Sequence, residues 1–235
     1  MSVEVEFVGH ACFRIWENGC PVIMTDPFDY ETLELPDLGT RFETDTVIVS
    51  SLTDDFHDNV ALAKGNPRVI NALDVALGKD NATISNEPII TLAVAEDPNH
   101  TLHAPMDNAM YAFHVGGLWF YHMGDLGYAV TLEQLAPFKD HCDVMIPLTG
   151  EKFTPRHEEL DPMIDFLKPK WIVPMHYAIP PVLFDMAPID KFLAHRSQDP
   201  VLIVRHHTVE FPLPTPRSDR PMIVVLDPSG YQRTG

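Results

Sequence analysis

The sequence is poor in cysteine and in basic residues, and it has no long apolar run. Its three cysteines, Cys12, Cys20 and Cys142, show no C-x-x-C spacing, which argues against a disulfide framework and a thiolate zinc site. Lys and Arg total 16 against 34 Asp and Glu, a formal charge of -18, which argues against nucleic acid or an anionic membrane as partner. Since no window approaches 18 consecutive apolar residues, no transmembrane helix is expected.

The amino-terminal segment lacks the features of a secretory leader. Residues Met1 to Phe7 alternate polar and apolar side chains as a strand does, with neither a basic region nor an apolar core. We therefore expect a cytoplasmic protein. Its 235 residues, 45% of them hydrophobic, suffice for one domain over 1–235. A small-molecule substrate or ligand is the expected partner, and a homo-oligomer is compatible with the sequence.

Two apolar strands deliver polar side chains at their ends. Residues Leu118 to Tyr121 form one such strand, and Asp125 follows it between Gly124 and Gly127, which permit a sharp turn. A second strand beginning at Trp171 ends at His176. Acid groups beside buried strands need a donor or a cation. The two ends therefore predict a polar centre.

Strands occur in runs at both ends of the chain and alternate with helices between them. This order predicts an α/β (α+β) fold with two sheets and helices outside them. Apolar residues at helical spacing predict helices over Phe56 to Lys64 and over Glu158 to Leu167.

An ordered set of short motifs resembles the metallo-β-lactamase fold family, in the branch of small metal-dependent hydrolases that includes the ascorbate-phosphate lactonases. The similarity runs from about Val3 to Leu226. Its motifs are Phe7 to Phe13, Thr25 to Pro27, Val47 to Ser50, His122 to Gly127, Asp143 to Pro147 and Ile172 to Tyr177. The resemblance implies a four-layer αββα sandwich with a metal centre at one edge.

The metal-binding motif of that family, H-x-H-x-D-H, is degenerate here. Aligned on residues 51–56, its three histidine positions hold Ser51, Thr53 and Phe56, and only Asp55 matches. In family terms Asp125 matches the bridging aspartate and His176 the last histidine. The resemblance therefore implies a centre reduced to Asp55, Asp125 and His176.

Such a set holds at most one divalent ion, with zinc, manganese, iron and magnesium as candidates, or none. Adding Glu96 at a further family position would make the set rich in oxygen, which favours magnesium, manganese or iron. His100 or His103 would take that position if the loop were shifted. His57 could replace a missing imidazole, but one step along a helix rotates a side chain by about 100°.

Structural roles compete with these assignments. Thr53 or Asp54 would cap the predicted helix, and Asp125 would suit a turn. His10 and His122 either line the mouth of the site or bond between strands, and we favour the structural role. Thr154 and Tyr177 are candidates for substrate contact by position alone.

Two functions follow from the reduced centre. In the first, a hydrolase with at most one metal cleaves an ester, lactone, phosphoester or amide, and Asp55 or Asp125 orients the attacking water. In the second, a metal-free relative binds a ligand or partner and catalyses nothing. A third mechanism, without metal, would use His176 and nearby acids as general acid and base.

Overall fold

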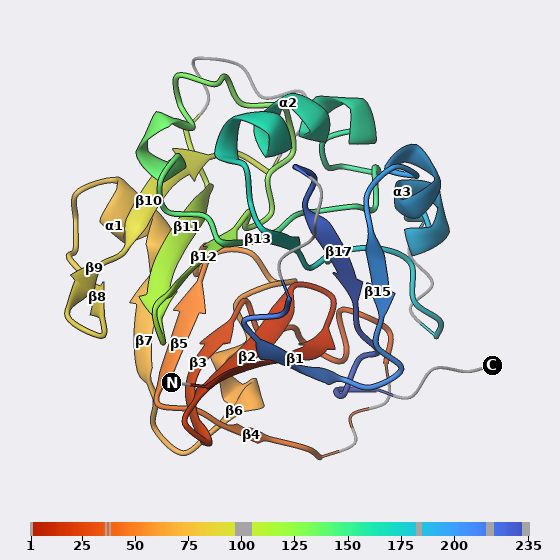
Figure 1. Ribbon diagram of the computed structural model, residues 1–235. Coiled ribbons are helices and arrows are strands. Elements are labelled where there is room, and N and C mark those ends of the chain that lie inside the picture. The colour runs from red at the N-terminus through yellow and green to blue at the C-terminus, as the bar shows by residue number, and fades with distance from the viewer. Residues whose placement is uncertain are drawn as a thin grey trace.

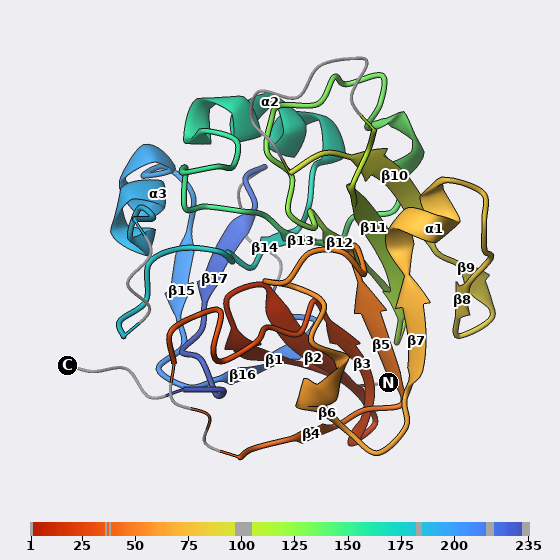
Figure 2. The same cartoon turned by 180° about the vertical axis from the view of Figure 1, so that it is seen from behind.

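Two β-sheets stacked face to face form the body of the protein in a computed structural model, which describes residues 2–35, 37, 39–96, 105–181, 185–214 and 219–231. Figures 1 and 2 show the two sheets one above the other, with helices on the outer side of the upper sheet. His100 and His103 lie outside the described residues.

The six-stranded sheet contains the amino-terminal strands. In spatial order it consists of β16 (Thr208–Phe211), β1 (Val3–Gly9), β2 (Cys12–Glu17), β3 (Cys20–Thr25), β5 (Thr46–Val49) and β7 (Arg68–Asn71). Strands β3, β5 and β7 run parallel, so their carboxyl ends meet at one edge of the sheet.

The seven-stranded sheet has its own parallel section. In spatial order it consists of β10 (Ile90–Val94), β11 (Asn108–Val115), β12 (Leu118–His122), β13 (Val144–Ile146), β14 (Trp171–Ile172), β17 (Met222–Val225) and β15 (Val201–Ile203). Strand β12 pairs in parallel with β13, and β13 with β14. The loops that carry Asp125 and His176 therefore leave the same edge of the sheet, one on each side of β13.

The helices are short and lie outside the sheets. Helices α2 (His157–Leu167) and α3 (Ile189–His195) lie above the seven-stranded sheet, and α1 (Ala72–Ala76) lies beside β10 and β11 (Figure 1). Buried side chains in α2 follow the amphipathic spacing that predicted it, from Leu160 to Leu167. Within the described part of the chain, no helix is long and apolar enough to cross a bilayer.

The helix predicted over Phe56 to Lys64 does not form. Its first residues make turns, followed by a 3-10 helix over Val60–Leu62 and the two-residue strand β6 (Ala63–Lys64). Strand β6 pairs with β4 (Phe42–Glu43), and this small sheet lies below the six-stranded sheet (Figure 1). A second small sheet joins β8 (Thr83–Ile84) to β9 (Glu87–Pro88), and a 3-10 helix spans Ala136–Phe138.

The hydrophobic core lies between the two sheets. Trp171 of β14 packs edge to face on Phe211 of β16, with ring centroids 5.3 Å apart. Within the six-stranded sheet Phe7 packs against Phe13 at 4.9 Å. Aromatic pairs of this kind add to the free energy gained by burying apolar area. This packing fixes the sheets against each other and holds the loops at their common edge in place.

Candidate functional site

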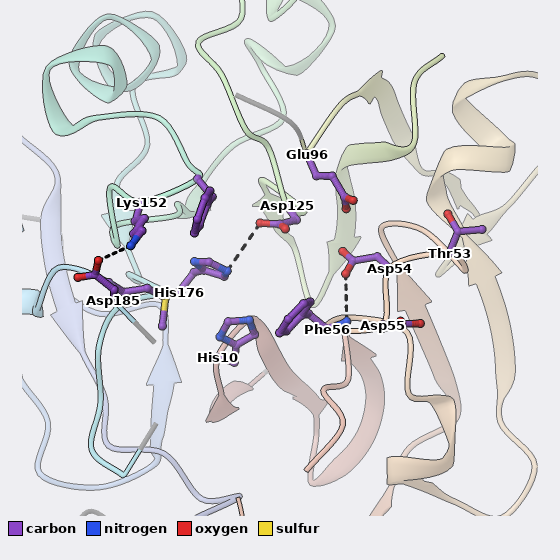
Figure 3. Close-up of a pocket in the computed structure, with 12 residues that line it drawn as sticks. His10, Thr53, Asp54, Asp55, Phe56, Glu96, Asp125, Lys152, His176 and Asp185 are labelled. Carbon is purple, nitrogen blue, oxygen red and sulfur yellow. Dashed lines mark hydrogen bonds and ion pairs between the residues drawn. The ribbon is translucent and has the colours of Figure 1, made fainter. Parts of the chain in front are cut away.

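A cavity of about 630 Å³ opens where loops from both sheets meet. Its polar wall includes His10, Asp54, Asp125 and His176, and Figure 3 shows these side chains converging on one region. They come from segments far apart in the sequence. The polar centre predicted from the two strand ends is therefore present.

His10 occupies the tight turn between β1 and β2. Its backbone is left-handed, with φ of 54°, and its carbonyl oxygen accepts a hydrogen bond of 2.9 Å from the backbone N–H of His176. Its ring lies 4.3 Å from the ring of His176 and stacks on that of His57 at 4.9 Å. Because a left-handed non-glycine residue is disfavoured, surrounding contacts must hold it there. This turn brings an imidazole from the amino-terminal hairpin into the centre.

Asp54 and His57 face each other across a turn after β5. The backbone N–H of His57 donates to the carbonyl of Asp54 at 2.9 Å, and the His57 Nδ1 lies 2.5 Å from the Asp54 Oδ2. Asn108 donates from its side chain to the same Oδ2 at 3.2 Å. The 100° rotation expected for a helix does not apply to this turn, so His57 points inward and is fully buried. Asp55 is exposed and points away from the centre (Figure 3).

Asp125 follows β12 through a glycine that cannot be replaced without a clash. A Cβ on Gly124 would overlap the carbonyl oxygen of Ala109, and its φ is +58°. The backbone N–H of Asp125 donates to the Oδ1 of Asn108 at 3.0 Å. Its carboxylate oxygens then lie 3.7 Å from the Nε2 of His176 and 3.9 Å from the Nδ1 of His57.

Burial and neighbouring charges give the imidazoles of His10, His57 and His176 different protonation states. Burial disfavours charge on His57, but Asp54 and Asp125 outweigh it and raise the pKa of His57 to about 10. Burial and the charge on His57 lower the pKa of His176 to about 3. Burial, His176 and His57 together hold the pKa of His10 well below its usual range. At neutral pH His10 and His176 are therefore neutral, which is the form that binds a metal.

Asp125 is a stronger proton acceptor than a solvent-exposed aspartate. Burial raises the pKa of its carboxyl to about 6, although His57 opposes the shift. The pKa of Asp54 is lowered, because His57 outweighs the opposing effect of burial. The centre therefore combines one firmly ionised acid with one whose pKa lies near physiological pH.

The donor atoms are close enough to hold a cation. Two groups have ligand atoms within 4.8 Å of one another: His10 with His57 and His176, and Asp54 with His57 and Asp125. The buried Nε2 of His57 and Nδ1 of His176 have no hydrogen-bond partner among the described residues. Buried polar atoms normally have one. The residues present therefore fit a divalent cation.

A second polar pair lies beneath this centre. Asp26 is fully buried at the end of β3, and its Oδ1 accepts a 2.6 Å hydrogen bond from the backbone N–H of Ser50. Its Oδ2 lies 3.4 Å from the Nδ1 of His122. That nitrogen already accepts from the backbone N–H of Gly124 at 3.0 Å, and the Nε2 of His122 contacts the carbonyl of Ala11 at 3.0 Å. His122 is therefore a neutral residue that joins strands.

The cavity wall includes some of the predicted site residues and leaves out others. His10, Asp55, Glu96, Asp125 and His176 line it, and His57 lies just behind them. Three predicted contacts do not line it. His122 bonds between strands, Tyr177 is buried with its hydroxyl 3.4 Å from the carbonyl of Leu226, and Thr154 is buried.

The sequence prediction missed Asp54, which it assigned to a helix cap. The structure buries Asp54 against His57, whereas Asp55 and Phe56 between them are exposed. The spacing Asp54-x-x-His57 is the signal in the sequence, because residues three apart lie on the same side of a helical turn.

Comparison with known proteins identifies the family. A family model described as a β-lactamase superfamily domain matches residues 4–176, most of the chain. The chain belongs to the β-lactamase superfamily. It is similar to a metal-dependent hydrolase of Thermococcus onnurineus, with 26% identity over 83% of this chain and 94% of the relative.

Solved structures of β-lactamase superfamily proteins agree with this fold. A metallo-β-lactamase superfamily protein from Thermotoga maritima superposes with a TM-score of 0.69 and 25% identity, covering 95% of this chain and 98% of that chain. A metallo hydrolase from Ignicoccus hospitalis gives 0.63 at 20% identity, covering 91% and 100%. The predicted α/β sandwich of the metallo-β-lactamase fold is confirmed.

Proposed function

We propose that this chain is a metal-dependent hydrolase that binds one divalent ion through His10, His57 and His176, with Asp125 as the acidic ligand. The observation that carries this proposal is the environment of His57. Its Nδ1 lies 2.5 Å from Asp54, while its buried Nε2 lacks a hydrogen-bond partner within the described residues. A metal-binding histidine commonly has this arrangement, with one nitrogen on a carboxylate and the other on the ion. Binding of the ion would displace the proton that the raised pKa of His57, about 10, keeps on its ring.

The donor set favours zinc or iron over magnesium. Three imidazoles and one carboxylate are rich in nitrogen, whereas magnesium prefers oxygen ligands. This choice departs from the oxygen-rich set that Asp55, Asp125 and Glu96 would give. The metal-dependent hydrolase of Thermococcus onnurineus to which the chain is similar supports a metal-based activity.

The reaction is the hydrolysis of an ester, lactone, phosphoester or amide. A divalent ion in this centre would acidify a water molecule and polarise the bond to be cleaved. Asp125 would hold the ion and orient that water beside it. Glu96 lines the same cavity, and burial and the nearby Asp54 raise its pKa to about 7, so it would exchange a proton with the leaving group.

A metal-free binding protein is the second candidate, and one observation favours it. The pKa of His57 is about 10, so a proton on its ring balances the negative charge of Asp54 at neutral pH. The centre would then be stable without an ion. In that case the cavity would bind a ligand and catalyse nothing.

Metal analysis separates these candidates. Wild-type protein purified without chelator, or reconstituted with zinc or iron(II), is expected to carry about one ion per chain. His57→Ala and Asp125→Ala should lose it, whereas Asp55→Ala, an exposed acid on the same wall, should retain it. If reconstituted wild-type protein carries no metal, the metal-dependent hydrolase is rejected and the metal-free protein is favoured.

A further inference from the structure

The entrance of the cavity is apolar, in contrast to its polar floor. Phe56 lies in the turn after β5. Phe153 lies in the segment that follows β13, and Met186 lies in the segment that precedes α3. Phe153 is 66% exposed and Phe56 is 39% exposed. Large apolar side chains that remain exposed beside a cavity are typical of a binding surface.

Phe153 is held in this exposed position by its loop. Its backbone is left-handed, with φ of 60°, and so is that of Glu151, with φ of 58°. Glu151 pairs with Lys191 and lies 3.2 Å from the Nδ1 of the buried His157. These contacts anchor the loop at its base. The phenyl ring is therefore presented at the cavity with most of its surface exposed to solvent, and the Lys152 Nζ lies 5.4 Å from its centroid.

The charges around the cavity disfavour anionic substrates. Five carboxylates line it, against one lysine, Lys152, which is paired with Asp185. A divalent ion held by Asp125 beside Asp54 would be neutralised by those two acids, which leaves the charge of Asp55 uncompensated and that of Glu96 partly so. The net charge of the chain, -18, adds to the repulsion.

We propose that the substrate is an uncharged ester, lactone or amide with an apolar group that packs between Phe56 and Phe153, and that phosphoesters are excluded. This assignment rests on the proposed function, because it names the substrate class of the same centre. The carbonyl would face the polar floor. The apolar group would extend toward Met186 at the entrance.

Substrate length and charge test the assignment in the zinc-loaded protein. From 4-nitrophenyl acetate to 4-nitrophenyl hexanoate, kcat/KM should rise by about tenfold, since each buried methylene contributes favourably and the entrance is only partly enclosed. 4-Nitrophenyl phosphate should be cleaved at least about a hundredfold less efficiently than the hexanoate. A phosphate ester cleaved as well as the hexanoate, or a flat response to chain length, would overturn the assignment while leaving the hydrolase intact.

A matched pair of variants locates the effect. Phe153→Ala should lower kcat/KM about tenfold for the hexanoate. It should change kcat/KM for the acetate by less than about twofold. Ile203→Ala is the control, because Ile203 is 59% exposed on β15 and does not line the cavity. Retained chain-length preference in Phe153→Ala would refute the role of this ring.

Binding provides a readout that is independent of turnover. Butyrophenone, an uncharged ketone that cannot be hydrolysed, should bind in calorimetry at least about tenfold more tightly than benzylphosphonate, and Phe153→Ala should weaken it. If no ester is cleaved, the hydrolase proposal fails, and these two ligands alone decide the substrate assignment. Tighter binding of the phosphonate would reject it.

Discussion

The Nδ1 of His57 lies 2.5 Å from the Oδ2 of Asp54, and both side chains are buried. This contact fixes the orientation of the imidazole, and its buried Nε2 has no hydrogen-bond partner among the described residues. Asp54, rather than the exposed Asp55, therefore supports the proposed metal ligand. The two neighbouring acids give opposite predictions for metal affinity.

Asp54→Asn should lower zinc affinity by about 10- to 100-fold, the usual effect of removing a carboxylate that orients a metal-binding histidine. Asp55→Asn should leave the affinity unchanged, because its side chain is exposed and points away from the imidazoles. A competition titration against a chromogenic chelator measures both. The reverse result would restore Asp55 as the ligand, as the family motif implies.

Gly124→Ala should displace Asp125. The new methyl group would overlap the carbonyl of Ala109, and φ of +58° is unfavourable for alanine. We expect a loss of at least about 2 kcal/mol in the free energy of unfolding, together with weaker metal binding. Gly117→Ala is the control, since its φ is +83° but the space around it is open. Equal losses in denaturant titrations of the two variants would show that the methyl clash contributes nothing.

Asp26→Asn should stabilise the protein more at pH 8 than at pH 5. Burial raises the pKa of Asp26 to about 7, from 3.8 for an exposed aspartate. The folded state therefore binds the extra proton between these values, and stability falls as pH rises through them, by up to about 1.4 kcal/mol for each pKa unit. An asparagine keeps the acceptor for Ser50 and adds a donor toward His122. Thermal melts of wild type and Asp26→Asn at pH 5 and pH 8 measure the stability gained by the substitution. An equal gain at the two pH values would show that ionisation of Asp26 is not the cause.

Asp199→Ala should be strongly destabilising. Asp199 is fully buried, accepts from the Nε of Arg196 at 2.5 Å, and also accepts from Arg220 at 2.9 Å. Removing it leaves the buried Arg196 with fewer acidic partners, for which a loss of about 3–5 kcal/mol is expected. Glu43→Ala breaks the exposed pair with Lys64 and should cost less than about 1 kcal/mol. Urea denaturation compares them, and similar losses would show that burial of the pair is unimportant.

Much of the fold could be predicted from sequence because its signals are local. The strand predicted over Leu118 to Tyr121 forms β12, and the helix predicted over Glu158 to Leu167 forms α2. Asp125 and His176 could be assigned to one centre because each lies in the loop that follows such a strand. Their position at the same edge of the sheet then follows from the parallel pairing of β12, β13 and β14.

The rest of the site depends on backbone geometry that composition does not encode. Apolar spacing from Phe56 onward predicted a helix, but the chain makes a turn there, which buries Asp54 and leaves Asp55 exposed. His10 was expected to be structural, and its left-handed turn brings it beside His176. These directions depend on contacts between residues far apart in the chain.

The hydrogen bond from His176 to the His10 carbonyl joins positions 10 and 176 of the 235-residue chain. During synthesis the first hairpin leaves the ribosome long before its partner, by roughly ten to thirty seconds at ordinary translation rates. Until the later segment emerges, His10 and His176 cannot meet. The first hairpin therefore folds before these two side chains can be brought together.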